Sequence, residues 1–531
     1  MEQLNVQPKP VIEVRDYSFS YEEIDEQPLF NRLSFALNEN EVTLLMGASG
    51  AGKSSLALCL NGLYPDAVEG TATGDIYFHG RHISEFEKGE LNQEIGIVFQ
   101  DPESQFCMIT VDDELAFTLE NRKFPASEIK GRIKEVLKAV GMEGFEQNKI
   151  HELSGGQKQK IALAAVLLLE PEMLILDEPT ANLDPVSSLE FIELVQEIQE
   201  ERGMSVLIIE HQADDWLELI DRVLVIGRDG QLLADDTPER LLTEQKQLLE
   251  QEGVFLPRAY SDAKDLRDVL PIAAPSEESV LSVDGLAFSR KKQQVLEDVS
   301  MDIRGGEFVA IVGENGAGKS TLLQLMAGLL TPSKGNVLLS GRKLEKWDEN
   351  ELRKRLGFVF QNPEHQFITD TVYEELTFGM RLNGYAEEEM EQAAGELMRQ
   401  FHLEKQHDSN PFSLSGGQKR RLSVATVLDE TPDILLFDEP TFGQDAATTA
   451  ELMHYVMELK SKGTAIVFVT HDMDIVDAAD RVSVLQHGKL AYDGSPEKLW
   501  EKEELLQEAR LRLPARMRLD RKEGVVYDLI H

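Results

Sequence analysis

At 531 residues the chain is too long for one ordinary core, and about two to four domains are expected. With 53 basic and 96 acidic side chains its formal charge is −43, so its field repels phosphate backbones, and nucleic acid is a poor candidate partner. Only two cysteines occur, Cys59 and Cys107, which excludes a disulfide framework or a cysteine-rich metal cluster and fits a reducing cytoplasm.

No stretch of the sequence is suited to crossing a membrane. The longest apolar run, residues 161–169, falls short of the roughly 20 residues that a bilayer requires. The N-terminus lacks a basic region followed by an apolar one, so no leader is expected. If the protein works at a membrane, partners must hold it there.

The two halves of the chain repeat one another, and a long-period repeat fixes the architecture before any motif is interpreted. The first half contains VRDYSFSY from residue 14, GASGAGKSS from residue 47, VFQDPESQF from residue 98 and LSGGQK from residue 153. The second half contains VDGLAFSR from residue 283, GENGAGKST from residue 313, VFQNPEHQF from residue 359 and LSGGQK from residue 414. We therefore expect a first domain over residues 1–257, a linker over 258–279, a second domain over 280–514 and a C-terminal tail over 515–531.

Short apolar runs in each half are typical of strands buried on both faces. In chain order they cover residues 42–46, 173–176, 206–209, 308–312, 434–437 and 465–469. Segments of helical period lie between them. This alternation predicts an α/β fold with a largely parallel sheet, whose functional loops lie at the carboxyl ends of the strands.

A glycine-rich loop of the pattern G-x-x-x-x-G-K-[ST] follows a predicted strand and precedes a helical segment in each half. Its backbone N–H groups can curl around phosphate oxygens, its lysine can reach the β- and γ-phosphates, and its first hydroxyl can help to hold Mg²⁺. The candidate nucleotide-binding residues of the first half are Gly47, Ala48, Ser49, Gly50, Ala51, Gly52, Lys53, Ser54 and Ser55. Those of the second half are Gly313, Glu314, Asn315, Gly316, Ala317, Gly318, Lys319, Ser320 and Thr321.

An Asp-Glu-Pro segment ends another apolar strand in each half. Adjacent carboxylates at a strand end point in different directions, so one can serve a metal and the other a water molecule. We assign Asp177 and Asp438 to Mg²⁺, and Glu178 and Glu439 to polarising the attacking water as general bases.

One histidine lies just beyond a further buried strand in each half, His211 in the first and His471 in the second. A lone histidine there would usually be structural. Because it recurs beside a nucleotide site, we expect both imidazoles to contact the γ-phosphate or the catalytic glutamate.

The LSGGQ segments resemble the signature motif of ATP-binding-cassette (ABC) proteins, and the resemblance covers nearly the whole chain. It implies two P-loop NTPase domains in tandem, each with a largely parallel core sheet, an antiparallel β part and a helical subdomain that carries the signature. In that family ATP lies between the phosphate loop of one domain and the signature of the other. Carried over here, the resemblance pairs the first phosphate loop with Ser415, Gly416 and Gly417, and the second with Ser154, Gly155 and Gly156.

The segments around Gln100 and Gln361 are similar to those of energy-coupling-factor and cobalt-importer ATPases. In that family this glutamine senses Mg²⁺ and water, and the following residues line the groove for a transmembrane coupling subunit. The matching residues are Gln100, Asp101, Pro102, Glu103, Gln361, Asn362, Pro363 and Glu364. The fused two-domain form is similar to ATPases linked to import of thiamine or its hydroxymethylpyrimidine (HMP) precursor. The resemblance implies ATP and Mg²⁺ as cofactors, a transmembrane and a substrate-binding membrane subunit as partners, and a peripheral position on the cytoplasmic face of the membrane.

The two halves differ where the family usually has an aromatic residue that stacks on adenine. Tyr21 occupies this place in the first half and Arg290 in the second. A guanidinium can also lie over an adenine ring. We hypothesise that the two sites differ in nucleotide affinity, with Tyr21 the tighter anchor, and that both sites hydrolyse ATP.

Two other classes of tandem cassette protein are alternatives. ATPases of sugar importers are separated from this chain by its Asp-Pro-Glu-x-Gln and Asn-Pro-Glu-x-Gln segments. Soluble cassette proteins that act on ribosomes or DNA usually carry a long basic linker, whereas residues 258–279 are short and the chain is acidic. A non-hydrolysing scaffold is disfavoured because no catalytic position is missing.

Overall fold

A computed structural model describes residues 9–21, 28–48, 50–65, 68, 70–211, 213–254, 256–257, 260, 275–290, 293–428, 431–441 and 446–522. Contacts within the chain divide it into two compact units. The first comprises Met1–Leu183 and Ser187–Ser261, and the second comprises Asp184–Val186 and Asp262–His531. Most of the expected linker and the last part of the expected tail lie outside the described residues.

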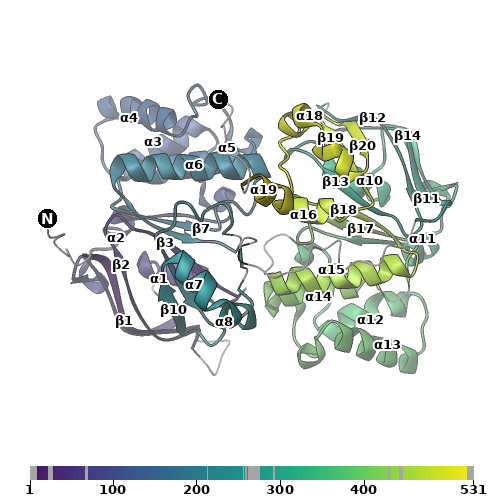
Figure 1. The fold of residues 1–531 in the computed structure, drawn as a ribbon, viewed down its shortest axis with the longest axis horizontal. Helices are drawn as coiled ribbons and strands as arrows, with labels where there is room; N and C mark the ends of the chain where they lie inside the picture. The colour runs from purple at the N-terminus through teal and green to yellow at the C-terminus, as the bar shows by residue number, and fades with distance from the viewer. Residues whose placement is uncertain are drawn as a thin grey trace. The chain divides into compact units, whose positions relative to one another are not determined.

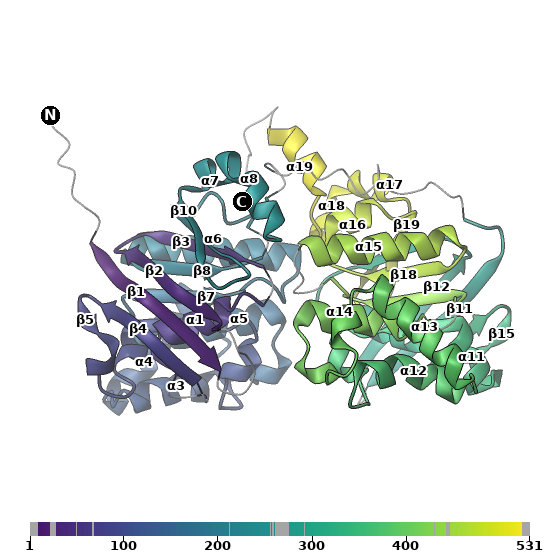
Figure 2. The same cartoon turned by 90° about the horizontal axis from the view of Figure 1, so that it is seen from below.

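The first unit contains two sheets (Figure 1). The core sheet has the order β10-β9-β3-β8-β7-β6, in which only the β9–β10 pair is antiparallel. Its strands are β3 (Val42–Gly47), β6 (Ile95–Val98), β7 (Met173–Asp177), β8 (Ser205–Ile209), β9 (Arg222–Ile226) and β10 (Leu232–Asp236). The second sheet is antiparallel, with the order β2-β1-β4-β5 (Figure 2). Its strands are β1 (Pro10–Tyr21), β2 (Phe30–Asn38), β4 (Gly70–Phe78) and β5 (Arg81–His82).

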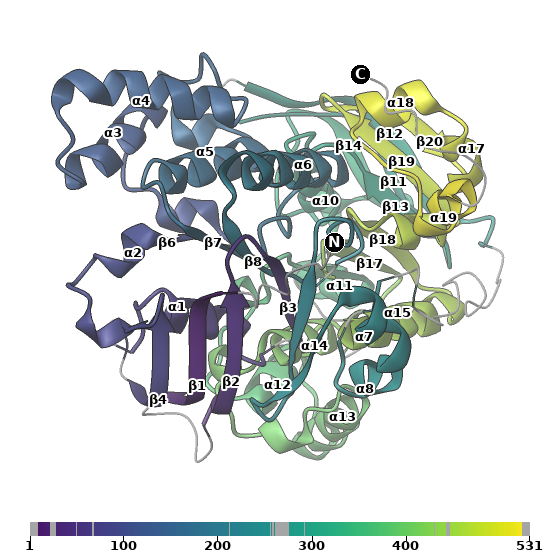
Figure 3. The same ribbon diagram turned by 60° about the vertical axis from the view of Figure 1, so that its left-hand side comes forward.

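The helices of the first unit pack on its core sheet, and α3, α4 and α5 gather into a separate helical part (Figure 3). In chain order they are α1 (Lys53–Leu60), α2 (Leu91–Glu94), α3 (Val111–Asn121), α4 (Ala126–Ala139), α5 (Gly155–Leu167), α6 (Pro185–Arg202), α7 (Pro238–Glu244) and α8 (Lys246–Gln251). The LSGGQ segment opens α5.

The second unit repeats this plan, with sheet orders β16-β17-β18-β13-β19-β20 and β12-β11-β14-β15. Its strands are β11 (Ser279–Arg290), β12 (Gln293–Arg304), β13 (Phe308–Val312), β14 (Lys334–Leu339), β15 (Arg342–Lys343), β16 (Leu356–Val359), β17 (Ile434–Asp438), β18 (Ala465–Val469), β19 (Arg481–Gln486) and β20 (Lys489–Gly494). Its helices are α10 (Lys319–Met326), α11 (Glu349–Arg355), α12 (Val372–Leu382), α13 (Glu387–Gln400), α14 (Gly416–Ala425), α15 (Ala446–Ser461), α16 (Met473–Asp477), α17 (Pro496–Trp500), α18 (Glu503–Glu508) and α19 (Ala515–Lys522). The expected architecture, with a largely parallel core sheet, an antiparallel β part and a helical part that carries the LSGGQ segment, is confirmed.

The parallel core strands have an apolar cluster on each face, which explains the continuous apolar runs in the sequence. In β3, Leu44 and Met46 pack into the cluster that contains α3 to α6, whereas Leu45 packs with α1 and the antiparallel sheet. In β13, Ala310 and Ile311 alternate between the two faces in the same way. All six predicted strands are confirmed.

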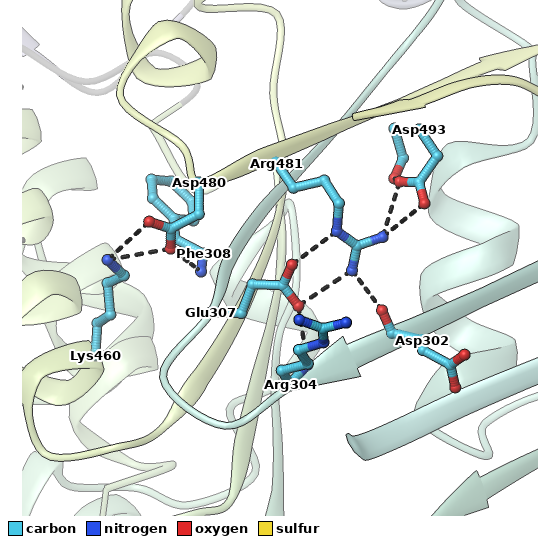
Figure 4. Close-up of polar contacts among 9 residues, drawn as sticks. Asp302, Arg304, Glu307, Phe308, Lys460, Asp480, Arg481 and Asp493 are labelled. Carbon is cyan, nitrogen blue, oxygen red and sulfur yellow. Dashed lines mark hydrogen bonds and ion pairs between the residues drawn. The ribbon is translucent and has the colours of Figure 1, made fainter. Parts of the chain in front are cut away.

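A network of ion pairs fastens the beginning of β13 to neighbouring strands (Figure 4). Arg481 donates through Nε to Glu307 at 2.7 Å and through Nη1 to both carboxylate oxygens of Asp493 at 2.8 Å. The third guanidinium nitrogen, Nη2, donates to the backbone carbonyl oxygen of Asp302. Because Glu307 is only 6% exposed, Arg481 compensates a buried charge.

A second carboxylate holds the first residue of the same strand. Asp480 accepts the backbone N–H of Phe308 at 2.7 Å and the amine of Lys460 at 3.1 Å (Figure 4). In the first unit Asp221 accepts the backbone N–H of Val42 at 2.9 Å. The strand that leads into each glycine-rich loop is therefore anchored at its beginning as well as buried along its length.

Replacing Arg481 by Met is expected to lower the free energy of unfolding of the second unit by about 3 kcal/mol, because Glu307 would remain buried without its partner. The control is Lys489→Met, which removes the exposed Lys489–Glu297 pair and should cost less than about 1 kcal/mol. Denaturant unfolding of both variants measures the difference. Equal losses would show that the Arg481 network does not stabilise the strand.

Candidate functional site

The lysine of each glycine-rich loop is buried beneath the loop. Lys53 donates to the carbonyl oxygens of Gly47 and Ala48 at 3.0 and 3.1 Å. Lys319 donates to those of Gly313 and Glu314 at 2.9 and 3.1 Å. Both lysines are 5% exposed. Each ammonium is thus held at the carboxyl end of β3 or β13 by two backbone carbonyl groups.

The glycine before each lysine makes this turn possible. Gly52 and Gly318 have φ values of 84° and 102°, in the left-handed region that favours glycine, and each caps the helix that follows. A Cβ on Gly52 would lie 2.7 Å from Phe30, and one on Gly318 would lie 2.8 Å from Leu296. The chain therefore enters α1 and α10 with their N-terminal N–H groups at the loop. Ser49 of the first loop lies outside the described residues.

A serine and an aspartate form the next layer of each site. Ser54 donates to Asp177 at 3.0 Å, and Ser320 donates to Asp438 at 2.9 Å. Burial raises the pKa of each aspartate to about 6, although the serine hydroxyl and the nearby lysine partly offset this effect. Hydroxyl and carboxylate oxygens of this kind are the protein ligands that Mg²⁺ prefers.

The glutamate after each aspartate has a side-chain partner at both of its carboxylate oxygens. Glu178 lies 3.0 Å from Nε2 of His211 through Oε1 and accepts a hydrogen bond from Gln100 at 2.7 Å through Oε2. Burial opposes the negative charge of Glu178, but nearby His211 and Lys53 outweigh burial and lower its pKa. An ionised carboxylate is therefore available beside the phosphate loop.

The second unit repeats the arrangement with slightly longer contacts. Glu439 lies 3.2 Å from Nε2 of His471 and accepts a hydrogen bond from Gln361 at 3.2 Å. Its pKa is lowered by His471 and Lys319 against the effect of burial. Burial also lowers the pKa of Lys319, an effect that the charges of Glu439 and other carboxylates oppose.

Both glutamates have an unusual backbone conformation. Glu178 and Glu439 each have φ of 46°, which is uncommon for residues with a side chain. Such conformations cost about 1 to 3 kcal/mol and tend to occur at functional sites. The same positive φ occurs at the matching glutamate of both units, which agrees with a requirement for one particular orientation of this carboxylate.

Tyr21 lies at the edge of the first phosphate loop. Its hydroxyl is 2.8 Å from that of Ser55, and its ring makes an edge contact with Tyr64 at 6.1 Å between centroids. Arg290, at the matching position, is exposed at the end of β11. The first phosphate loop therefore has an aromatic ring beside it at this position, whereas the second has an exposed guanidinium.

The LSGGQ segments cap the helices of the helical parts. The side chain of Ser154 accepts the backbone N–H of Gln157, and that of Ser415 accepts the backbone N–H of Gln418. In both cases the glutamine side chain accepts the serine N–H in return, which completes a capping box. The N-terminal ends of α5 and α14, formed by Gly155, Gly156, Gly416 and Gly417, are thereby fixed with their positive dipole ends at the signature.

The glutamine loops continue into short 3-10 turns at Pro102–Gln105 and Pro363–His365. Asp101 and Asn362 cap these turns through their side chains. A lysine of the signature helix reaches a glutamate of each turn, in the pairs Lys158 with Glu103 and Lys419 with Glu364. Each glutamine loop is therefore in contact with the helical part of its own unit.

Some side chains at the site are not indicated by the motifs. Glu210, which directly precedes His211, is 4% exposed and accepts from the N–H and hydroxyl of Thr180 at 3.1 and 2.6 Å. Burial raises its pKa to about 8, partly offset by Thr180. Asn182 and Arg420 bond the backbone of the glutamine loops. In the sequence Arg420 could have been noticed because the matching residue of the first half, Gln159, is uncharged.

Comparison with known proteins agrees with this geometry. A family model described as ABC transporter matches residues 30–181 and 296–442. A Bacillus subtilis (strain 168) protein, YkoD, provisionally named as an HMP/thiamine import ATP-binding protein, is 46% identical over 525 residues, which cover 95% of each chain. A provisionally named ABC transporter ATP-binding protein of Methanosarcina acetivorans is 33% identical over 97% of this chain and 91% of its own.

A solved structure of cbiO1 from Clostridium perfringens, described as part of the ABC transporter complex cbiONQ, covers 46% of this chain and 100% of its own, with 33% identity and a TM-score of 0.40. The family match spans both glycine-rich loops and both Asp-Glu pairs. The chain therefore belongs to the ABC transporter family and is an ABC ATPase with two cassettes in tandem.

Proposed function

We propose that this ATPase energises a membrane importer of the energy-coupling-factor type, with a vitamin or vitamin precursor such as thiamine or HMP as the imported compound. The observation that carries the proposal is the similarity along nearly the whole chain to the B. subtilis import ATP-binding protein. The glutamine loops, which resemble those of energy-coupling-factor ATPases, support the type of importer. A transition-metal cation is an alternative cargo.

The site residues take the following roles in this proposal. The phosphate loops bind ATP, and Lys53 and Lys319 contact its terminal phosphates. Mg²⁺ is held by Ser54, Gln100 and Asp177 in the first cassette and by Ser320, Gln361 and Asp438 in the second. The serine–aspartate hydrogen bonds of 2.9 to 3.0 Å support these sets, because they bring two oxygen ligands of the kind that Mg²⁺ prefers next to one another in each cassette.

Glu178 and Glu439 act as general bases toward the attacking water. The lowered pKa of each glutamate supports this role, since a base must be ionised at working pH. His211 and His471 orient the glutamates and reach toward the γ-phosphate. Gln100 and Gln361 would exchange their bond to the glutamate for one to Mg²⁺ when nucleotide binds.

Two composite sites form when each phosphate loop pairs with the signature of the other cassette. In this proposal the first loop meets Ser415, Gly416 and Gly417, and the second meets Ser154, Gly155 and Gly156. The capped N-termini of α5 and α14 would place N–H groups at the γ-phosphate. ATP then closes the pair, and loss of phosphate permits reopening, which gives the mechanical step of transport.

Apolar side chains beside the glutamine loops offer a docking surface for a transmembrane subunit. Ile109 and Ile368, which each lie within three residues after the glutamine loop of their cassette, are 67% and 64% exposed. Phe412 is 48% exposed and makes an edge contact with Phe367 at 6.0 Å between centroids. Exposed apolar groups in such a setting are typical of interaction sites. None of the described helices could span a bilayer. On the similarity to the B. subtilis import ATP-binding protein, we propose a peripheral position on the cytoplasmic face of the membrane.

Substituting both general bases should stop hydrolysis. Glu178→Gln or Glu439→Gln alone is expected to reduce steady-state ATP turnover by about half or more, and the double variant by at least about 100-fold. Binding of a fluorescent ATP analogue should persist, because the phosphate loops are unchanged. Wild-type turnover in the Glu178→Gln protein would refute the assignment.

The two sites should bind ATP with different affinity. Lys319→Ala leaves the first phosphate loop intact and Lys53→Ala leaves the second, so nucleotide titration of the two proteins compares the sites. We expect about threefold to tenfold tighter binding at the first site because Tyr21 offers an aromatic face. Adding Tyr21→Ala should remove the difference. Equal affinities in the two single-loop proteins would contradict the hypothesis.

Charged substitutions on the docking surface should release the membrane partner. Ile109→Asp with Ile368→Asp is expected to prevent co-purification of a transmembrane subunit from detergent-solubilised membranes, while ATP binding remains. Leu329→Asp is the matched control, because Leu329 is 53% exposed in the turn after α10. Full recovery of the membrane subunit with the double variant, or recovery of ribosomes in its place from the wild type, would overturn the proposal.

A further inference from the structure

The signature helices α5 and α14 differ along the face that meets the glutamine loop. Three positions spaced three residues apart are all polar in α14 and its C-cap. In α5 one of the three matching positions is polar and the other two are alanine. These positions are Arg420, Ser423 and Thr426 in the second cassette and Gln159, Ala162 and Ala165 in the first. Residues at this spacing share one face of a helix.

Arg420 bonds the backbone of the second glutamine loop. Its guanidinium donates through Nη1 to the carbonyl oxygen of Phe360 at 2.7 Å and through Nη2 to that of Gln361 at 2.5 Å. Arg420 is 2% exposed. Because a buried charge is costly unless it is hydrogen-bonded, these two carbonyl groups and the side chain stabilise one another.

A second glutamine of the same loop is bound to the same helix face. Gln366 donates through Nε2 to the carbonyl oxygen of Ser423 at 2.8 Å and to the hydroxyl of Thr426 at 2.6 Å. Ser423 donates its hydroxyl to Oε1 of Gln366 at 3.0 Å. All three polar residues of this face therefore hold the glutamine loop of the second cassette.

Both cassettes have a lysine–glutamate pair between the signature helix and the glutamine loop, but the first cassette makes its other loop contacts through different elements. Gln105, which corresponds to Gln366, donates to the carbonyl oxygen of Ile97 on β6 at 3.3 Å. The carbonyl oxygen of Gln100 accepts from Asn182, which lies in the loop after the Asp-Glu-Pro segment, at 3.0 Å. Gln159 is 1% exposed, and its Nε2 has no hydrogen-bond partner among the described residues.

The same backbone carbonyl group of the glutamine loop accepts a side-chain hydrogen bond in both cassettes, but the donor differs. We call this hydrogen bond the tether of the loop. Gln100 and Gln361 are equivalent, and each presents this oxygen to a side-chain donor. The donor comes from Asn182 in the first cassette and from Arg420 in the second. The residue that matches Asn182 in the second half is Gly443, which has no side chain to donate and lies outside the described residues.

We propose that Arg420 is a positioning residue that fixes Gln361 beside Glu439 and makes the second glutamine loop move together with its signature helix. The first glutamine loop shares only the exposed lysine–glutamate pair with its signature helix among the contacts described above, and its further hydrogen bonds go to β6 and to the segment that contains Asn182. The same displacement of a docked partner would therefore reach different elements in the two cassettes. The proposal rests on the assignment of Gln361 and Glu439 to an ATP site and not on the identity of the imported compound.

The test replaces Arg420 by Gln, the residue that the first cassette carries at this position. In the full nucleotide-free chain we expect faster hydrogen–deuterium exchange in residues 360–366 and unchanged exchange in residues 99–105, because only one loop loses its tether. We also expect kcat for ATP hydrolysis to fall at least about twofold and the Mg²⁺ concentration for half-maximal rate to rise, with KM for ATP unchanged. Arg420→Lys, which keeps a donor, should be intermediate.

Arg421→Gln is the matched control, since it removes the same charge from the same helix and breaks the ion pair with Glu451, which is not part of the glutamine loop. Wild-type exchange, kcat and Mg²⁺ requirement in Arg420→Gln, or the same changes in Arg421→Gln, would overturn the proposal. The exchange measurement needs neither nucleotide nor a membrane partner, so it separates failure of the tether from failure of the proposed function.

A reciprocal pair of variants in the first cassette decides the matter if Arg420→Gln does not fold. Asn182 is exposed, so Asn182→Gly should leave the fold intact and speed exchange in residues 99–105. Adding Gln159→Arg should slow that exchange again, because α5 would then supply the guanidinium that α14 supplies in the second cassette. Unchanged hydrogen–deuterium exchange in Asn182→Gly would contradict the proposal. So would exchange that stays fast in residues 99–105 after Gln159→Arg is added.

Discussion

The carboxylate of Glu178 is contacted by a histidine on one oxygen and by a glutamine on the other, and Glu439 has the same surroundings. These contacts depend on the sheet. Glu178, His211 and Gln100 each follow within two residues of the end of β7, β8 or β6, which are neighbours in the core sheet. Because parallel strands end at one edge, side chains far apart in the sequence meet at a single carboxylate.

The phosphate loop depends on the same constraint. β3 and β13 are buried on both faces and anchored at their first residues, so the turn at Gly52 or Gly318 delivers its lysine to a fixed place. The serine of the loop then reaches Asp177 or Asp438 at the end of a strand two places along the sheet. A rigid parallel sheet is what allows short loops to form a site that can stabilise phosphate charge.

The sequence predicts this part of the molecule well because its signals are local. A glycine-rich loop, an Asp-Glu pair or an apolar run occupies a few consecutive residues, and the internal repeat supplies each signal twice. The tether from Arg420 to the carbonyl of Gln361 joins residues 59 positions apart, and a backbone carbonyl carries no mark in the sequence. Glu210 was missed for a related reason, since only burial and the bonds to Thr180 distinguish it from a surface acid.

Two cassettes that keep every hydrolytic residue can still differ in how those residues are held. Tyr21 and Arg290 differ at the nucleotide edge, and Asn182 and Arg420 differ in how they support the glutamine loop. The glutamate, histidine and lysine are the same in both sites, so these differences lie in the residues around them.

If ATP hydrolysis at these sites drives import, transport of the compound into proteoliposomes must depend on it. The chain is reconstituted with the membrane subunits that co-purify with it, and accumulation of radiolabelled thiamine or HMP is followed with and without ATP. The account predicts accumulation that requires ATP and disappears with the Glu178→Gln, Glu439→Gln double variant. Accumulation that continues without ATP, or hydrolysis by the complex with no accumulation of either compound, would contradict it.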